Sequence, residues 1–335
     1  DLATGKSEVV YADSRADVAN VIVHPTENTL QAVSATYLRE EWKVLDPAIA
    51  ADFEALGKAA KGEFAIASRT LDDQVWIVSY LQDAGPVTYY RYDRPGKKAT
   101  FLFTARPALE GKTLAPMHAR AIPARDGLEL VSYLTLPAGS DPDADGVPAA
   151  PAPMVLFVHG GPWARDEWGY DPYHQWLANR GYAVLAVNFR GSTGFGKKFL
   201  NAGNREWAAR MHDDLIDAVD WAVARKIADP KKVAIMGGSY GGYATLVGLT
   251  FTPEKFAAGV DIVGPSNIET LLGSIPPYWA PILSVFEQRV GEIKTEEGKT
   301  FLRSRSPLFK VDAIQRPLLI GQGANDPRVK QAEAD

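Results

Sequence analysis

The stretch KKVAIMGGSYGGYATLVG, residues 231–248, decides the fold. Its apolar residues 233–236 predict a strand, and the apolar run from Ala244 predicts a helix. The pattern G-x-S-x-G lies between them and consists of Gly237, Gly238, Ser239, Tyr240 and Gly241. So tight a turn strains its central residue, and flanking glycines avoid side-chain clashes. We therefore expect the Ser239 hydroxyl to project from the sheet as a nucleophile, with the Tyr240 backbone N–H facing the same site. The alternative is a glycine-rich turn with an incidental serine.

A second glycine-containing loop follows an earlier predicted strand. The stretch FVHGGPWARD, residues 157–166, has a His-Gly-Gly-Pro form in which missing side chains let backbone N–H groups approach a developing oxyanion. Gly161 is the expected donor, alongside the N–H of Tyr240. We expect His159 to order this loop through hydrogen bonds rather than to act as a base.

Two carboxylates compete for the role of the acid that would accompany Ser239. Asp326 follows the apolar run PLLIGQG (317–323) and is favoured, because it lies just beyond a predicted strand. Asp261 lies inside GVDIVG (259–264), where apolar neighbours suggest a strand position that points elsewhere.

The histidine is the missing member of this set. In folds that carry a nucleophilic serine on such a strand-to-helix turn, the chain order is serine, acid, histidine. All five histidines nevertheless precede Ser239: His24, His118, His159, His174 and His212. His212 is expected on a helix face and His174 in a surface helix, so the simplest account places the base beyond residue 335. The sequence is then expected to be a fragment.

The chain divides into two regions that differ in their predicted secondary structure. Residues 1–115 hold short alternating or aromatic runs and predict a partial β-propeller of about two blades. Similar turn-plus-strand units at residues 1–12 and 92–103 support such a repeat, and the remaining blades are expected upstream. Residues 116–335 alternate strands and helices, which indicates a mostly parallel, doubly wound sheet. Residues 137–153, with five prolines, are expected to form an exposed hairpin loop rather than a domain linker.

Composition excludes several classes of protein. The net charge is −5 and no basic run stands out, which argues against nucleic acid as a partner. No apolar stretch approaches the roughly 20 residues that span a bilayer, which argues against a membrane-embedded protein. The absence of cysteine excludes disulfides, thiolate chemistry and cysteine metal sites. No cofactor or metal ion is expected, and compartment and oligomeric state stay open.

The motifs together resemble a known family. HGGPWARD, NFRGSTGFGKKF, GGSYGGYAT and GANDPRV stand in the order and at the spacing found in the prolyl oligopeptidase family of serine peptidases, in its acylaminoacyl-peptidase and dipeptidyl-peptidase-like branch. The resemblance implies an α/β-hydrolase domain, incomplete at its C-terminal end, after the last blades of a propeller. It also implies Ser239 as nucleophile, Asp326 as acid, Gly161 and Tyr240 as oxyanion hole, and a histidine a few dozen residues after the acid.

The resulting hypothesis is a serine peptidase that hydrolyses short peptides through an acyl-enzyme, inactive as this fragment for lack of its histidine. One alternative is an esterase acting on small acyl esters, although propeller-like strands argue against it. Another is a dinucleotide-binding oxidoreductase, but the glycines of NFRGSTGFG (188–196) do not fit G-x-G-x-x-G. The third is a non-catalytic propeller-hydrolase scaffold. The aromatic residues Tyr278, Trp279 and Phe286 fit either packing or a side-chain pocket.

Overall fold

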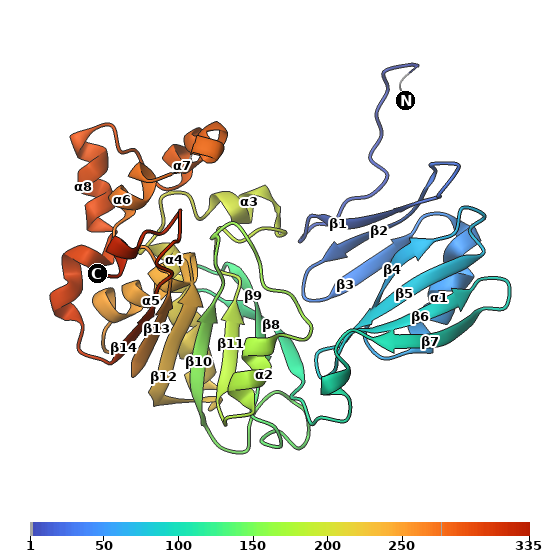
Figure 1. Cartoon of the computed structure of the whole chain (residues 1–335), viewed down its shortest axis with the longest axis horizontal. Coiled ribbons are helices and arrows are strands. Elements are labelled where there is room, and N and C mark those ends of the chain that lie inside the picture. Colours follow the sequence, from blue (N-terminus) through green and yellow to red (C-terminus); the bar gives the residue numbers. More distant parts are fainter. Residues whose placement is uncertain (1–2, 276) are drawn as a thin grey trace. The chain divides into compact units, whose positions relative to one another are not determined.

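The computed structural model describes residues 3–275 and 277–335 (Figure 1). The chain divides into two compact units. The first unit extends to Thr113 and includes Gly194–Gly196, and the second is formed by Leu114–Thr193 and Lys197–Asp335. Among the described residues, no helix has both the length and the apolarity that a membrane span requires.

The first unit contains two antiparallel sheets. One has the order β1 (Val18–Val23), β2 (Leu30–Thr36), β3 (Glu40–Val44), and the other β4 (Glu63–Arg69), β5 (Val75–Leu81), β6 (Thr88–Asp93), β7 (Lys98–Thr104). Residues 7–12 form no strand, so the predicted repeat unit is wrong at its first copy. The sequence analysis also missed helix α1 (Ala50–Ala59) between the two sheets in the chain.

A shared core explains why α1 forms where it does. Alternate residues of β5, among them Trp76 and Tyr80, are buried together with Leu56 of α1. The Tyr80 hydroxyl donates a hydrogen bond of 2.8 Å to the Leu56 carbonyl oxygen. The fully buried Asp52 of α1 accepts one of 3.0 Å from the Tyr92 hydroxyl. Helix α1 therefore depends on these tertiary contacts, since a helix this short is marginal by itself.

The second unit is built on a seven-stranded sheet of order β14-β13-β12-β10-β11-β9-β8. The bounds are β8 (Met117–Pro123), β9 (Glu129–Thr135), β10 (Ala152–Val158), β11 (Ala183–Val187), β12 (Ala228–Gly238), β13 (Ala258–Ile262) and β14 (Leu318–Gly321). Strands β10 to β14 pair in parallel, whereas β9 pairs antiparallel with β8 and β11. Strands β9 and β10 both lie beside β11, so the residues up to 151 form a crossing loop, residues 152 and 153 begin β10, and the predicted hairpin at residues 137–153 is wrong.

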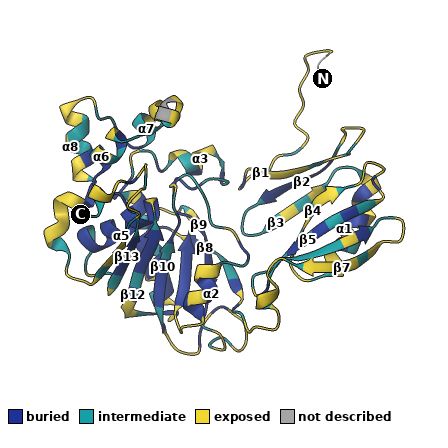
Figure 2. Ribbon diagram, in the orientation of Figure 1, coloured by how far each residue is buried: buried dark blue, intermediate teal, exposed yellow. Residues whose placement is uncertain are grey.

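This sheet packs against the helices α2 (Pro172–Ala178), α4 (Arg210–Ala224) and α5 (Tyr240–Phe251). The helices α3 (Gly196–Asn201), α6 (Ile268–Gly273), α7 (Leu283–Arg289) and α8 (Glu296–Ser304) complete the set. Trp207 lies before α4, outside the helix. Helix α5 is buried over almost its whole length (Figure 2). Such a helix is apolar all round and packs into the centre of a domain.

A buried ion pair joins α4 to the chain after β11. Arg190 is 3% exposed and Asp214 0%, and Arg190 Nη2 donates a hydrogen bond of 2.7 Å to Asp214 Oδ1. We expect Asp214→Ala to lower the free energy of unfolding by about 3–5 kcal/mol, because it leaves the guanidinium buried without its main partner. Urea denaturation checks this. The control, Asp220→Ala, removes the exposed Lys255–Asp220 pair and should cost at most about 1 kcal/mol. Equal losses in both variants would contradict the prediction.

Candidate active site

Ser239 occupies the turn between β12 and α5. Its φ of 56° and ψ of −115° put it in the left-handed region, which a residue with a side chain adopts at a cost in energy. Hydrogen bonds fix the turn on both sides: Ser239 N donates to Ile262 O (2.8 Å), and Tyr243 N donates to Ser239 O (3.0 Å). The helix begins at Tyr240, earlier than the predicted Ala244, and β12 begins before the predicted residue 233.

The glycines around Ser239 differ in how strongly the fold needs them. A Cβ atom at Gly237 would lie 2.4 Å from Val158 O, and one at Gly241 only 2.0 Å from the same atom. These two glycines therefore let the turn pass close to the end of β10. At Gly238 the nearest neighbour of a Cβ atom would be Ile262 O at 3.8 Å, an ordinary contact. The space around Gly238 does not by itself require glycine.

The loop after β10 lies against this turn. A Cβ atom at Gly160 would lie 3.1 Å from Gly238 O and 3.5 Å from Ser239 Cβ. The next residue, Gly161, has a φ of +123°. Because Tyr240 is the first residue of α5, its backbone N–H has no acceptor within the helix, and the helix dipole favours negative charge beside it. The arrangement suits a developing negative charge next to Ser239.

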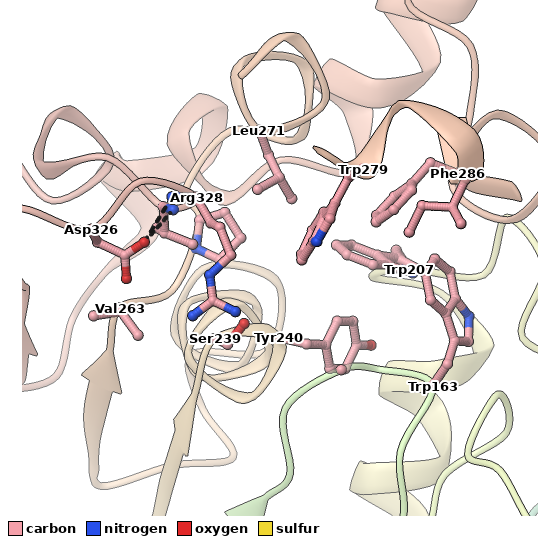
Figure 3. Close-up of a pocket in the computed structure, with 14 residues that line it drawn as sticks. Trp163, Trp207, Ser239, Tyr240, Val263, Leu271, Trp279, Phe286, Asp326 and Arg328 are labelled. Atoms are coloured by element: carbon pink, nitrogen blue, oxygen red, sulfur yellow. Dashed lines mark hydrogen bonds between the residues drawn. The ribbon is translucent and has the colours of Figure 1, made fainter. Parts of the chain in front are cut away.

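One cavity of about 270 Å³ contains all four predicted catalytic and oxyanion-hole residues in its lining (Figure 3). These are Ser239, Asp326, Gly161 and Tyr240. They come from the chain after β10, the turn after β12 and the chain after β14, at the carboxyl ends of parallel strands. This is where open α/β sheets place their ligand sites.

The Asp326 carboxylate has a fixed orientation. Its Oδ1 accepts hydrogen bonds from Arg328 N (2.8 Å) and Val329 N (3.0 Å), and its own N–H donates to Gly323 O (3.2 Å). The competitor Asp261 is buried in β13 and is not among the residues that line the cavity. Its Oδ1 accepts from Gly264 N (2.8 Å), and burial raises the pKa of this carboxyl to about 7.

His159 lies inside the domain and contacts the loop that it precedes. Its Nδ1 is 2.8 Å from Gly160 O and its Nε2 is 3.0 Å from Ser192 Oγ. The ring stacks on Phe189 at 4.5 Å. Burial lowers the pKa of His159 to about 4, so the imidazole is neutral at pH 7. These contacts hold the backbone at Gly160.

None of the five histidines lines the cavity that contains Ser239. His174 differs from the prediction of a surface position: Tyr173 and Trp176 are exposed on α2, but His174 is 3% exposed and lies 2.9 Å from Thr135 Oγ1. The helix is amphipathic, and His174 is on its inner face. His212 is buried as well, and its Nε2 lies 2.9 Å from Thr252 Oγ1.

Aromatic side chains form much of the cavity wall. Trp279 and Phe286 line it and stack at 5.9 Å, whereas Tyr278 is 66% exposed and is not among the lining residues. Several further lining residues were not predicted from the sequence, among them Trp163, Trp207 and Arg328. Two of these, Trp163 and Arg328, could have been predicted from the sequence, because each stands two positions after a predicted site residue in the same loop. Figure 3 shows the Arg328 side chain extending toward Ser239.

Comparison with known proteins identifies the family. Residues 168–334 match the model of the prolyl oligopeptidase family. Dipeptidyl aminopeptidase BIII of Pseudoxanthomonas mexicana is 60% identical over 335 residues, covering 100% of this chain and 49% of that protein. The chain belongs to the prolyl oligopeptidase family. Dipeptidyl peptidase family member 6 of Caenorhabditis elegans is 46% identical over 346 residues, covering 98% of this chain and 47% of that protein.

Comparison with solved structures confirms the predicted fold class. The solved acylaminoacyl peptidase of Pyrococcus horikoshii superposes with a TM-score of 0.71 at 21% identity, covering 95% of this chain and 48% of that one. The second unit is an α/β-hydrolase domain, and the antiparallel sheets of the first correspond to propeller blades. The chain spans about half the length of the curated relatives it matches.

Proposed function

We propose that this chain belongs to a serine peptidase that hydrolyses short peptides through an acyl-enzyme at Ser239. The observation that carries the proposal is the convergence of a strained serine turn, a glycine loop and a hydrogen-bonded carboxylate on one cavity. Its relatives' names, a dipeptidyl aminopeptidase and a dipeptidyl peptidase, support the same chemistry.

The proposed reaction has two halves. Ser239 Oγ attacks the scissile carbonyl while a histidine accepts its proton, and the N–H groups of Gly161 and Tyr240 bind the resulting oxyanion. The intermediate collapses, the imidazolium gives its proton to the leaving amine, and the acyl group stays on Ser239. Water then attacks the ester with help from the same histidine, and the acid product leaves. Asp326 orients the imidazole and stabilises its charged form.

We place this histidine outside residues 1–335. Support comes from the five histidines of the chain, none of which lines the cavity, and from the greater length of the relatives. Residues 1–335 alone are accordingly expected to show little turnover, because loss of the base in such a triad costs about 10⁶ in kcat.

The cavity favours a substrate with a bulky apolar side chain next to the scissile bond. Trp163, Trp207, Trp279 and Phe286 supply aromatic walls, and Asp326 and Arg328 are the charged residues that line it. Burying a large apolar side chain is worth about 1.5–3 kcal/mol. We therefore propose peptides with phenylalanine or leucine at this position as preferred substrates over those with glycine.

Labelling with a fluorophosphonate tests the function. We expect the complete natural protein to form one covalent adduct, located by mass spectrometry at Ser239. Its hydrolysis of a peptide anilide should decline at the rate at which this adduct forms. A labelled protein that hydrolyses a short acyl ester but no peptide anilide would instead indicate an esterase. A protein that keeps its peptidase activity while Ser239 stays unlabelled would contradict the proposal.

A further inference from the structure

Trp163 connects the loop that carries Gly161 to helix α7. Its ring centre lies 5.1 Å from that of Phe286 in an edge-to-face arrangement, and the Arg289 guanidinium carbon lies 5.2 Å from the Trp163 ring centre. Both geometries are attractive, since ring edges and cations favour the face of an aromatic ring. Figure 3 shows the Trp163 side chain directed toward Phe286 at one end of the cavity.

The backbone between Trp163 and Gly161 is tightly folded. A Cβ atom at Gly161 would lie 2.7 Å from Trp163 N, and Ala164 N donates a hydrogen bond of 2.9 Å to Pro162 O. Only two peptide units separate the indole-bearing residue from the proposed oxyanion donor. A displacement of Trp163 therefore changes where the Gly161 N–H points.

The two ends of this loop are held by the body of the domain. Before the turn, His159 lies 2.8 Å through Nδ1 from Gly160 O and 3.0 Å through Nε2 from Ser192 Oγ. After it, Thr193 N donates to Ala164 O (2.9 Å) and Asp166 N donates to Asn188 Oδ1 (2.8 Å). The middle of the loop lines the cavity, and there the indole of Trp163 contacts α7. The indole thus adds a third point of attachment between the other two.

Helix α7 offers the indole a fixed partner. At its C-terminal end, Arg289 O accepts a hydrogen bond of 2.6 Å from Arg205 N, and the next residue, Val290, is buried. Val290 N donates to Phe286 O at 2.8 Å. Trp279 stacks on Phe286 as well, so the Phe286 ring is packed between two tryptophans. Of the two residues that contact Trp163, Arg289 therefore lies at the anchored end of α7, and Phe286 lies one turn before it.

From these contacts we infer that Trp163 is a positioning residue, which holds the Gly161 N–H in place for the transition state through its contact with Phe286 and Arg289. The inference rests on the proposed function, because it concerns the oxyanion of that reaction. An oxyanion donor acts only over a narrow range of distances, and a misplacement of about 1 Å in a catalytic site costs about 10² in rate. Since the oxyanion forms only after the substrate has bound, on the way to and in the tetrahedral intermediate, the effect belongs to kcat rather than to KM.

Kinetics of a peptide anilide with the complete natural protein test this assignment. We expect Trp163→Ala to lower kcat about 10-fold to 100-fold and to change KM much less. Trp163→Phe keeps a ring against Phe286 and should stay within about threefold of wild type. The control is Trp221→Ala in α4, which also removes an indole that lies under a guanidinium, that of Arg225 at 4.6 Å, and should leave kcat unchanged.

The contact is also tested from its other side, which covers the case of an unstable Trp163→Ala. We expect Phe286→Leu to lower kcat in the same way, and the double variant Trp163→Leu with Phe286→Leu to lose less than the product of the two single losses. An unchanged kcat with a raised KM in Trp163→Ala would overturn the inference and leave Trp163 with no role beyond that of a cavity wall. Fully independent effects of the two residues would also overturn it.

Labelling with a fluorophosphonate separates this inference from the proposed function. A wild-type protein that is not labelled at Ser239 refutes the proposed function, and the inference with it. A wild-type protein labelled at Ser239, together with a Trp163→Ala variant of normal kcat, refutes the positioning role alone.

Discussion

The substitution Ser239→Ala should lower kcat for a peptide anilide by about 10⁶ in the complete natural protein. In the proposed reaction this position supplies the atom that becomes covalently bound to the substrate, so no neighbouring group takes its place. The oxyanion donors and the cavity remain, and they leave a residual acceleration of about 10³–10⁴ over water. We therefore expect binding of a peptide product to survive while turnover and fluorophosphonate labelling disappear.

A matched control separates this effect from a general loss of structure. Ser140 lies in the crossing loop between β9 and β10, where its Oγ donates to Pro137 O at 2.7 Å, and Ser140→Ala should keep full activity. Far-UV circular dichroism and the urea midpoint should be alike in both variants and in wild type. Residual peptidase activity of Ser239→Ala above about 1% of wild type would show that another group is the nucleophile.

The part of the site that follows from the sequence is the part fixed by local backbone geometry. Gly237 and Gly241 have no room for a side chain against Val158 O, and that requirement appears in the sequence as a pattern of fixed spacing. Asp326 follows a parallel strand directly, so its place at the carboxyl edge of the sheet was also predictable.

The cavity walls are a different case, because they depend on tertiary packing. Trp163, Trp207 and Trp279 come from three separate segments, and no spacing in the sequence shows that they meet at Ser239. An aromatic residue in a loop fits a core and a substrate pocket equally well. Only the path of each loop over the sheet decides between these positions.

Long-range pairing also explains the errors in the fold prediction. The strands on either side of residues 137–153 are close in sequence, yet β11 lies between them in the sheet. Residues 7–12 have the apolar composition of a strand but no partner strand. His174 stands in a helix with two exposed aromatic neighbours, but its own side chain lies on the face of that helix that packs inward. In each case the deciding contact joins residues far apart in the chain.

The substitution Asp326→Asn should lower kcat by about 10⁴ and leave the loop in place. Asparagine keeps an Oδ1 that accepts hydrogen bonds from Arg328 N and Val329 N, so the geometry after β14 is preserved. What is lost is the negative charge that, in the proposed reaction, stabilises the imidazolium and selects the reactive tautomer of the histidine. The control is Asp261→Asn, which likewise keeps its acceptor for Gly264 N and lies outside the cavity. If Asp261→Asn lost the activity and Asp326→Asn kept it, the two carboxylates would have to exchange roles.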